Sequence, residues 1–183
     1  MTVWVRRVAL GLTAAIFIVV AIGYLLPRQV SVTRTVEVAA PPAAVFALVG
    51  DLRRFSEWAP WLEGDADVVI TFTGPLSGGG QTMEWRSEKP EIGSGRQTVT
   101  RVEPDREVEM TVDFGEGDRP TMWIGLEAAG AATAVTWGSR TDLGAGPLAH
   151  YLGLRLDARI GPDLERGLAK LKTLAEASPP QPG

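Results

Sequence analysis

Hydrophobic and polar residues alternate with a period of two along much of the chain between residues 30 and 142. The alternation is clearest in REVEMTVDF (106–114), where Glu109 and Thr111 separate Val108, Met110 and Val112. This period predicts strands with one apolar face, because successive side chains of a strand point to opposite sides. Short turn-forming clusters separate the later strands, which favours hairpins and a single antiparallel sheet. The seven predicted strands are 30–38, 66–73, 80–88, 95–103, 106–114, 120–128 and 132–142.

After residue 147 the period changes to the spacing of a helix. Leucine or isoleucine stands at positions 148, 152, 156, 160, 164, 168 and 171, which predicts an apolar stripe on a long C-terminal helix over 147–176. Gly161 and Pro162 interrupt this pattern and predict a kink or a division into two helices. A sheet with one apolar face needs a cover, so we expect the sheet to curl around this helix.

The segment AAPPAAVFALVGDLRRFSEWAPWLEG (39–64) connects the first strand to the second. Pro41 and Pro42 end the strand because they have no N–H to donate, and Pro42 suits the first turn of a helix. Gly50 and Asp51 predict the end of that helix and the cap of a second short one. We expect the two short helices to carry the chain between opposite edges of the sheet and to close one end of it. The predicted fold class is α+β.

The N-terminal region contains nineteen consecutive residues, 8–26, without a charged side chain. As a helix they span about 28 Å, close to the hydrocarbon thickness of a bilayer, which predicts an uncleaved transmembrane helix directed away from the domain. A secretory signal is the alternative. Its apolar core is shorter and small residues follow it, whereas Tyr24-Leu25-Leu26-Pro27 follows here. The predicted division is a membrane anchor at 1–29, a domain at 30–177 and a disordered tail at 178–183.

The distribution of charge bears on orientation and on partners. Arg6 and Arg7 precede the apolar span and favour a cytoplasmic N-terminus, with the domain on the extracytoplasmic side of the cell membrane. Without these two, 16 Lys and Arg face 22 Asp and Glu, a net charge of −6. This balance disfavours nucleic acid as a partner. The absence of cysteine excludes disulfides and thiolate chemistry.

Candidate catalytic residues are few. His150 is the only histidine, so a zinc site would need ligands that zinc rarely uses, and no G-x-S-x-G context accompanies a serine. Acidic residues at 105, 107 and 109 fit the solvent face of one strand. Gly78-Gly79-Gly80 precedes a strand and lacks the Lys-Ser/Thr of a phosphate loop. We therefore predict no catalytic residue, no metal site and no cofactor.

Tryptophans and methionines on inward-facing positions are the better candidates for a binding site. Trp85 shares strand parity with Met83, and Trp137 with Val135, whereas Trp123 is expected to face outward. Core packing is the alternative role for each of them, although large apolar side chains also suit a ligand pocket. Arg140 and Asp157 are candidates for a polar pair facing the cavity, with a surface pair as the alternative. Met110 is a further candidate for the lining of the cavity. Trp61, Tyr151, Leu152 and Leu154 are predicted to gate ligand entry at the mouth of the pocket.

The chain resembles the START-like superfamily known as SRPBCC, in particular its polyketide cyclase/dehydrase-like branch. The resemblance covers about residues 30–177. It rests on VEVAAPPAAVFALVGDLRRFSEWAPW (36–61), EIGSG (91–95) and GPDLERGLAKLK (161–172). It implies the helix-grip fold, with a cavity for an apolar ligand between the sheet and the C-terminal helix.

Three functions remain open from the sequence. The leading hypothesis is a membrane-anchored carrier of a hydrophobic small molecule, lipid-like or polyketide-like. The second is a cyclase or dehydratase acting on an apolar substrate, in which positioning carries the reaction. The third is a module that binds a protein partner of unknown identity, with an interior filled by side chains. The size of the cavity and the ionisable groups inside it distinguish the three.

Overall fold

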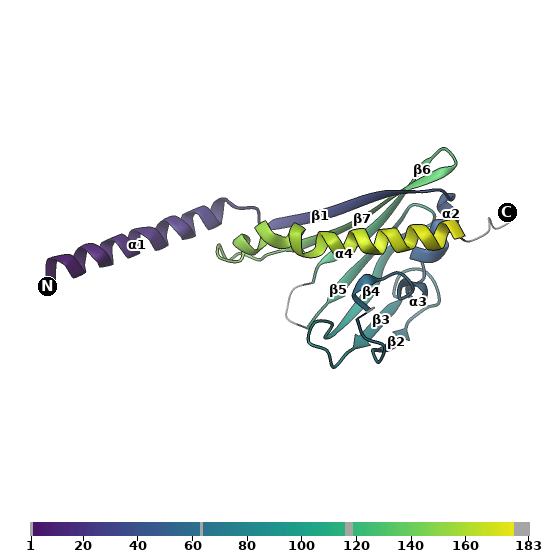
Figure 1. The fold of residues 1–183 in the computed structure, drawn as a ribbon, viewed down its shortest axis with the longest axis horizontal. Coiled ribbons are helices and arrows are strands. Elements are labelled where there is room, and N and C mark those ends of the chain that lie inside the picture. The colour runs from purple at the N-terminus through teal and green to yellow at the C-terminus, as the bar shows by residue number, and fades with distance from the viewer. Residues whose placement is uncertain (1, 63, 116–118, 178–183) are drawn as a thin grey trace.

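A single antiparallel sheet forms the centre of the domain (Figure 1). The computed structural model describes residues 2–62, 64–115 and 119–177. The strands stand in the order β1-β7-β6-β5-β4-β3-β2, so that β1 and β2 occupy opposite edges, as predicted. Their bounds are β1 Gln29–Val38, β2 Val69–Thr73, β3 Thr82–Arg86, β4 Ser94–Glu103, β5 Glu107–Asp113, β6 Thr121–Ala129 and β7 Ala132–Asp142.

The crossing between the two edges consists of α2 (Pro42–Val49), α3 (Leu52–Phe55) and η1 (Pro60–Leu62). Pro41 precedes α2 in an extended conformation, and the Asp51 side chain caps α3 by accepting a hydrogen bond from the Arg53 amide. The crossing contributes Leu48, Leu52, Phe55 and Trp58 to the core, where each is almost fully buried. This segment therefore closes one end of the curled sheet.

The C-terminal helix α4 (His150–Ala177) packs along β1 and also contacts β7, α2 and η1. It continues without a break through Gly161 and Pro162 (Figure 1), so the expected division into two helices is wrong. Proline removes only one intrahelical hydrogen bond, and Leu164, Leu168 and Leu171 bury the following turns against the core. Tertiary packing thus outweighs the local cost of Pro162.

The N-terminal helix α1 (Thr2–Leu25) projects away from the domain (Figure 1). Its segment Val3–Leu25 is long and apolar enough to cross a membrane, and only 6% of the most apolar window is buried. The C-terminal end of α1 nevertheless contacts the start of α4, where Tyr151 donates a hydrogen bond to the Val19 carbonyl. The tail predicted at 178–183 lies outside the described residues.

Candidate functional site

Four aromatic side chains meet where the crossing segment faces the sheet and α4. The Trp137 ring from β7 lies 5.1 Å from the Trp58 ring, 5.5 Å from that of Trp61 and 6.1 Å from that of Phe55, measured between centroids. Gly167 of α4 faces the Trp137 ring so closely that an added Cβ would come within 2.4 Å of it. The cluster therefore joins β7, the crossing segment and the middle of α4.

A second group lies on β3, β4 and β5 and consists of Met83, Trp85, Gln97 and Met110. Met83 is the cross-strand partner of Gln97, and Trp85 is that of Gly95, two residues earlier on the same face of β4. The Gln97 amide donates to the Met110 sulfur. Strand parity predicted the inward direction of Trp85. Gln97 was not among the predicted site residues, although its parity with Val99 indicates the same inward direction.

The interior at these positions is filled by side chains. Met83, Met110 and Trp137 expose 0% of their surface and Trp85 exposes 3%. A side chain bordering a space large enough for water would retain accessible surface on that side. These four predicted pocket residues therefore pack against their neighbours in this conformation, and a ligand between them would have to displace side chains.

Three polar atoms in this interior have no hydrogen-bond partner among the described residues. They are the indole nitrogens of Trp85 and Trp137 and the amide oxygen Oε1 of Gln97. A buried polar group without a partner costs about 1–3 kcal/mol, so such groups indicate where the fold could receive a polar atom. By contrast, the Trp58 indole N–H donates to the Leu48 carbonyl at 3.4 Å.

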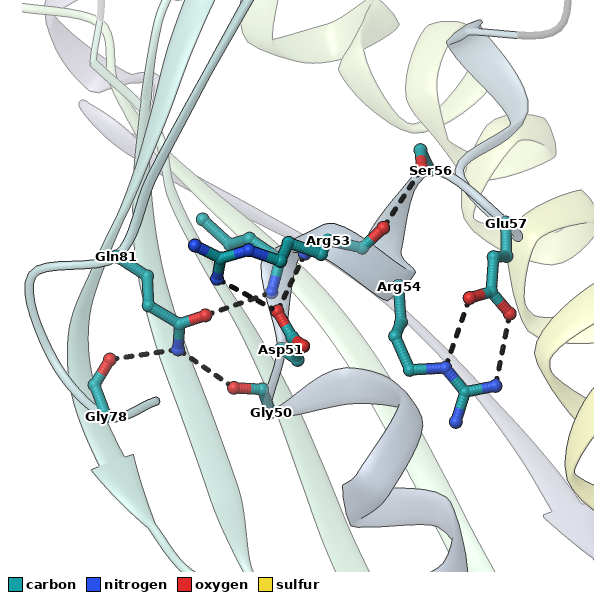
Figure 2. A network of polar contacts seen from close by, with 9 residues as sticks. Gly50, Asp51, Arg53, Arg54, Ser56, Glu57, Gly78 and Gln81 are labelled. Atoms are coloured by element: carbon teal, nitrogen blue, oxygen red, sulfur yellow. Dashed lines mark hydrogen bonds and ion pairs between the residues drawn. The ribbon is translucent and has the colours of Figure 1, made fainter. Parts of the chain in front are cut away.

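Gln81 has a structural environment that the sequence did not reveal (Figure 2). Its side chain is 1% exposed. Its Nε2 donates to the carbonyl oxygens of Gly50 and Gly78 at 2.9 and 3.0 Å, and its Oε1 accepts from the Leu52 amide at 3.2 Å. Gln81 thus connects the junction of α2 and α3 with the turn before β3.

Figure 2 also shows the charged side chains on the outer side of this junction. Arg54 forms two hydrogen bonds of 3.1 Å to Glu57. Asp51 accepts from the Arg53 amide at 2.9 Å, and Ser56 donates to the Arg53 carbonyl. These contacts stabilise α3.

The expected polar pair of Arg140 and Asp157 is not formed. Arg140 is exposed and stacks over the outward-facing Trp123 ring at 5.2 Å. Asp157 is also largely exposed and accepts two hydrogen bonds, of 2.8 and 3.1 Å, from Arg34 of β1. Arg34 also donates to Glu165 at 2.6 Å. The hydrogen bonds between Arg34 and Asp157 lower the pKa of the Asp157 carboxyl. The hydrogen bonds to Asp157 and Glu165 raise the pKa of the Arg34 guanidinium.

The expected gate is likewise split between two places. Leu152 and Leu154 are 65% and 66% exposed at the start of α4, whereas η1, which contains Trp61, packs near Gly167 through Pro60. Fifteen residues of helix separate Leu152 from Gly167, a distance of about 22 Å. The crossing segment approaches the middle of α4 because Gly167 lets Pro60 and Trp137 come close.

Two open hollows lie on the surface, and neither is lined by a predicted site residue. A hollow of about 360 Å³ is lined by Glu57, Ala169, Lys170, Thr173 and Leu174. A hollow of about 690 Å³ is lined by Pro41, Pro42, Ala43, Asp105, Arg106, Leu126, Glu127 and Ala128.

Among the residues that the structure describes, two ionisable side chains are buried, and both are engaged by neighbouring groups. Asp65 accepts a hydrogen bond from Ser87, which lowers its pKa. His150 lies with Nδ1 2.8 Å from the Gly23 carbonyl and Nε2 3.0 Å from that of Gly144. Both ring nitrogens donate only when the ring is protonated. Within the described ranges, no three His, Asp or Glu side chains gather as a metal site would require.

A seven-stranded antiparallel sheet, a crossing segment that closes one end and a long C-terminal helix define an SRPBCC-type helix-grip protein. The chain belongs to the family described as polyketide cyclase / dehydrase and lipid transport, whose profile matches residues 29–176. This family is of the type that binds hydrophobic small molecules. A search of the curated proteins finds no match.

Solved structures share the fold at low sequence identity. Truncated norcoclaurine synthase from Thalictrum flavum superposes with a TM-score of 0.64 at 11% identity, over 82% of this chain and 96% of that one. Ara h 8.0201 gives 0.58 at 13% identity, over 82% and 99%. Protein CV1439 from Chromobacterium violaceum gives 0.54 at 17% identity, over 83% and 100%. At these identities the likeness shows the fold alone.

Proposed function

We propose that this protein is a membrane-anchored carrier that binds a hydrophobic small molecule between the sheet and α4. In this proposal residues 1–29 anchor residues 30–177 at the extracytoplasmic face of the cell membrane. One observation carries the binding function: the interior is apolar, yet the Trp85 N–H and the Gln97 Oε1 lie in it without partners among the described residues. A ligand with an apolar body and one polar group would satisfy both.

The chemistry of these two atoms favours a hydroxyl as the polar group of the ligand. An indole N–H only donates, and the Gln97 Oε1 only accepts, so a hydroxyl can accept from the first and donate to the second. The two side chains come from diagonal neighbours on β3 and β4, which lie within reach of one group. Met83 and Met110 adjoin them, and methionine side chains rearrange readily around an inserted body.

A second candidate is a module that binds a protein partner and has a filled interior. The complete burial of Met83, Met110 and Trp137 favours it. The enzymatic alternative would need ionisable groups converging inside. The two buried ionisable groups, Asp65 and His150, instead lie before β2 and at the start of α4 and have separate partners.

Ligand binding is tested with the full chain in mild detergent. Native mass spectrometry should detect a small molecule that co-purifies with the protein, and a fluorescent apolar alcohol should compete with it. Trp85→Phe removes the indole N–H and keeps an aromatic ring. A lost hydrogen bond of about 1 kcal/mol should weaken binding of the probe about fivefold.

The matched control is Trp123→Phe, which changes the tryptophan on the outer face and should leave the affinity unchanged. Equal affinities in wild type and Trp85→Phe would reject the role of the Trp85 N–H. Failure of wild type to bind any probe or to carry a small molecule would favour the partner-binding module instead.

A further inference from the structure

The end of α1 and the start of α4 lie side by side (Figure 1). Tyr151 donates to the Val19 carbonyl at 2.7 Å, and the His150 ring contacts the Gly23 carbonyl at 2.8 Å. Pro147 lies so close to Gly23 that an added Cβ would come within 2.4 Å of the Pro147 carbonyl oxygen. These contacts therefore hold the first turn of α4, and Pro147 just before it, against the last turns of α1.

These contacts determine the depth of the start of α4 if α1 spans a bilayer. The uncharged span ends at Leu26, and Val19 lies seven residues before it, about 10 Å along the helix axis. The Tyr151 hydroxyl bonded to the Val19 carbonyl would then lie below the level at which the chain leaves the hydrocarbon. The first turn of α4 cannot stay in bulk water while this contact is kept.

The side chains at this place fit a lipid environment. Leu148, Leu152 and Leu154 are 62%, 65% and 66% exposed. At 100° per residue, Leu152 and Leu154 point about 200° apart around α4, so one flat protein surface could not cover both. Lipid acyl chains that surround the helix can cover both leucines. A tyrosine such as Tyr151 beside them is typical of the membrane–water interface.

Basic residues follow at the next level along α4. Arg155 and Arg159 are exposed and lie about 5 and 10 Å beyond Leu152 along the helix. Neither forms an ion pair with another residue in the described part of the chain. Guanidinium groups placed above an apolar surface can bind lipid phosphates while their stems remain among the leucines.

From these observations we propose that residues 147–154 form a second membrane-embedded segment, which inserts into the bilayer interface beside the end of α1. Its partner is the phospholipid bilayer, with Leu148, Leu152 and Leu154 among the acyl chains and Arg155 at the phosphates. The proposal rests on the proposed membrane anchorage and adds that the domain is seated in the membrane surface rather than suspended above it.

The test uses the full chain, because its lack of cysteine permits single labelling sites. Leu148→Cys, Leu152→Cys and Leu154→Cys are each labelled with an environment-sensitive fluorophore and reconstituted into phosphatidylcholine–phosphatidylglycerol vesicles with brominated acyl chains. Phe17→Cys is the reference within α1, and Leu76→Cys is the reference on the domain, in the turn between β2 and β3. Phe17 and Leu76 are each 77% exposed.

We expect bromine to reduce fluorescence most at 17, near the middle of the span, and to reduce it at 148, 152 and 154 several-fold more than at 76. Quenching at 17 with none at 148, 152 and 154 would overturn the embedded segment and leave the anchor intact. Absence of quenching at 17 would overturn the membrane anchor together with the embedded segment. The two failures are therefore distinguishable.

Discussion

Gln81 illustrates how one buried polar side chain can hold several backbone groups. Its amide makes three hydrogen bonds, to Gly50, Leu52 and Gly78, and these groups belong to segments that are not hydrogen-bonded to one another as a sheet. Because the side chain is almost fully buried, water cannot replace it when it is removed. Its contribution to stability should therefore exceed that of an exposed glutamine.

Replacing Gln81 with methionine should lower the free energy of unfolding by about 1–3 kcal/mol, because one buried and two partly buried backbone groups lose their partner while the volume stays similar. Denaturation of the full chain in detergent, followed by circular dichroism, measures the change. Thr71→Ala, at an exposed position of β2, is the control and should change it little. A Gln81→Met midpoint equal to that of wild type would show that these hydrogen bonds are dispensable.

At the scale of elements, sequence periodicity predicted the seven strands, the two edges and the long helix. It did so because alternation and helical spacing are local properties of the chain. At Gly161 and Pro162 it allowed a division into two helices, which is wrong because packing of Leu164, Leu168 and Leu171 keeps the helix continuous. It also missed the pairing of Arg34 with Asp157, because that pairing requires knowing that α4 lies along β1.

The sequence predicted which side chains of the candidate site point inward, but not how much space remains between them. Parity placed Met83, Trp85 and Trp137 on the inner face, and all three are buried. Whether space remains between inner side chains depends on the combined packing of distant elements, so the filled interior could not be predicted. The separation of Trp61 from Leu152 and Leu154 likewise depends on where the crossing segment meets α4.

The glycines of α4 determine how closely the helix approaches its neighbours. Gly167→Ala would gain about 1 kcal/mol in helix propensity, yet its Cβ would lie 2.4 Å from the buried Trp137 ring. Overpacking costs about 1–3 kcal/mol, so we expect a net loss of up to about 2 kcal/mol on chemical denaturation. Ala169→Gly, at an exposed position of the same helix, should cost about 1 kcal/mol through propensity alone. A Gly167→Ala protein that is more stable than wild type would contradict the close packing.

At the scale of the whole molecule, ion pairs join the start of the domain to both of its large elements. Arg28, just after α1, forms hydrogen bonds of 2.7 and 3.0 Å to Asp142 at the end of β7. Arg34 joins β1 to α4 through Asp157. Arg28 directly precedes β1 and Arg34 lies within it, and β1 is the edge strand that follows the proposed anchor. Loss of these ion pairs would weaken both the attachment of β1 at the edge of the sheet and the packing of α4 against β1.

These pairs predict how the stability of the domain depends on pH. Hydrogen bonds from Arg28 and, to a smaller extent, from the Gly144 amide lower the pKa of Asp142 from 3.8 to about 2. The hydrogen bond from Arg34 lowers the pKa of Asp157. A carboxylate whose pKa is lower in the folded state stabilises that state above its ordinary pKa, and this stabilisation is lost as the pH falls toward its folded value. The midpoint of unfolding should therefore be insensitive to these groups near neutral pH and should decrease as the pH falls from about 4 to about 2.

Asp142→Asn removes one titrating group, so it should lower the midpoint of unfolding at neutral pH and make its decrease in acid shallower. Asp67→Asn, at an exposed position of a turn, is the control and should leave the pH profile of the midpoint unchanged. The lower midpoint at neutral pH and the shallower decrease in acid are both expected from loss of the hydrogen bonds to Asp142. An identical profile of midpoint against pH in Asp142→Asn and wild type would therefore show that the pair with Arg28 does not stabilise the fold.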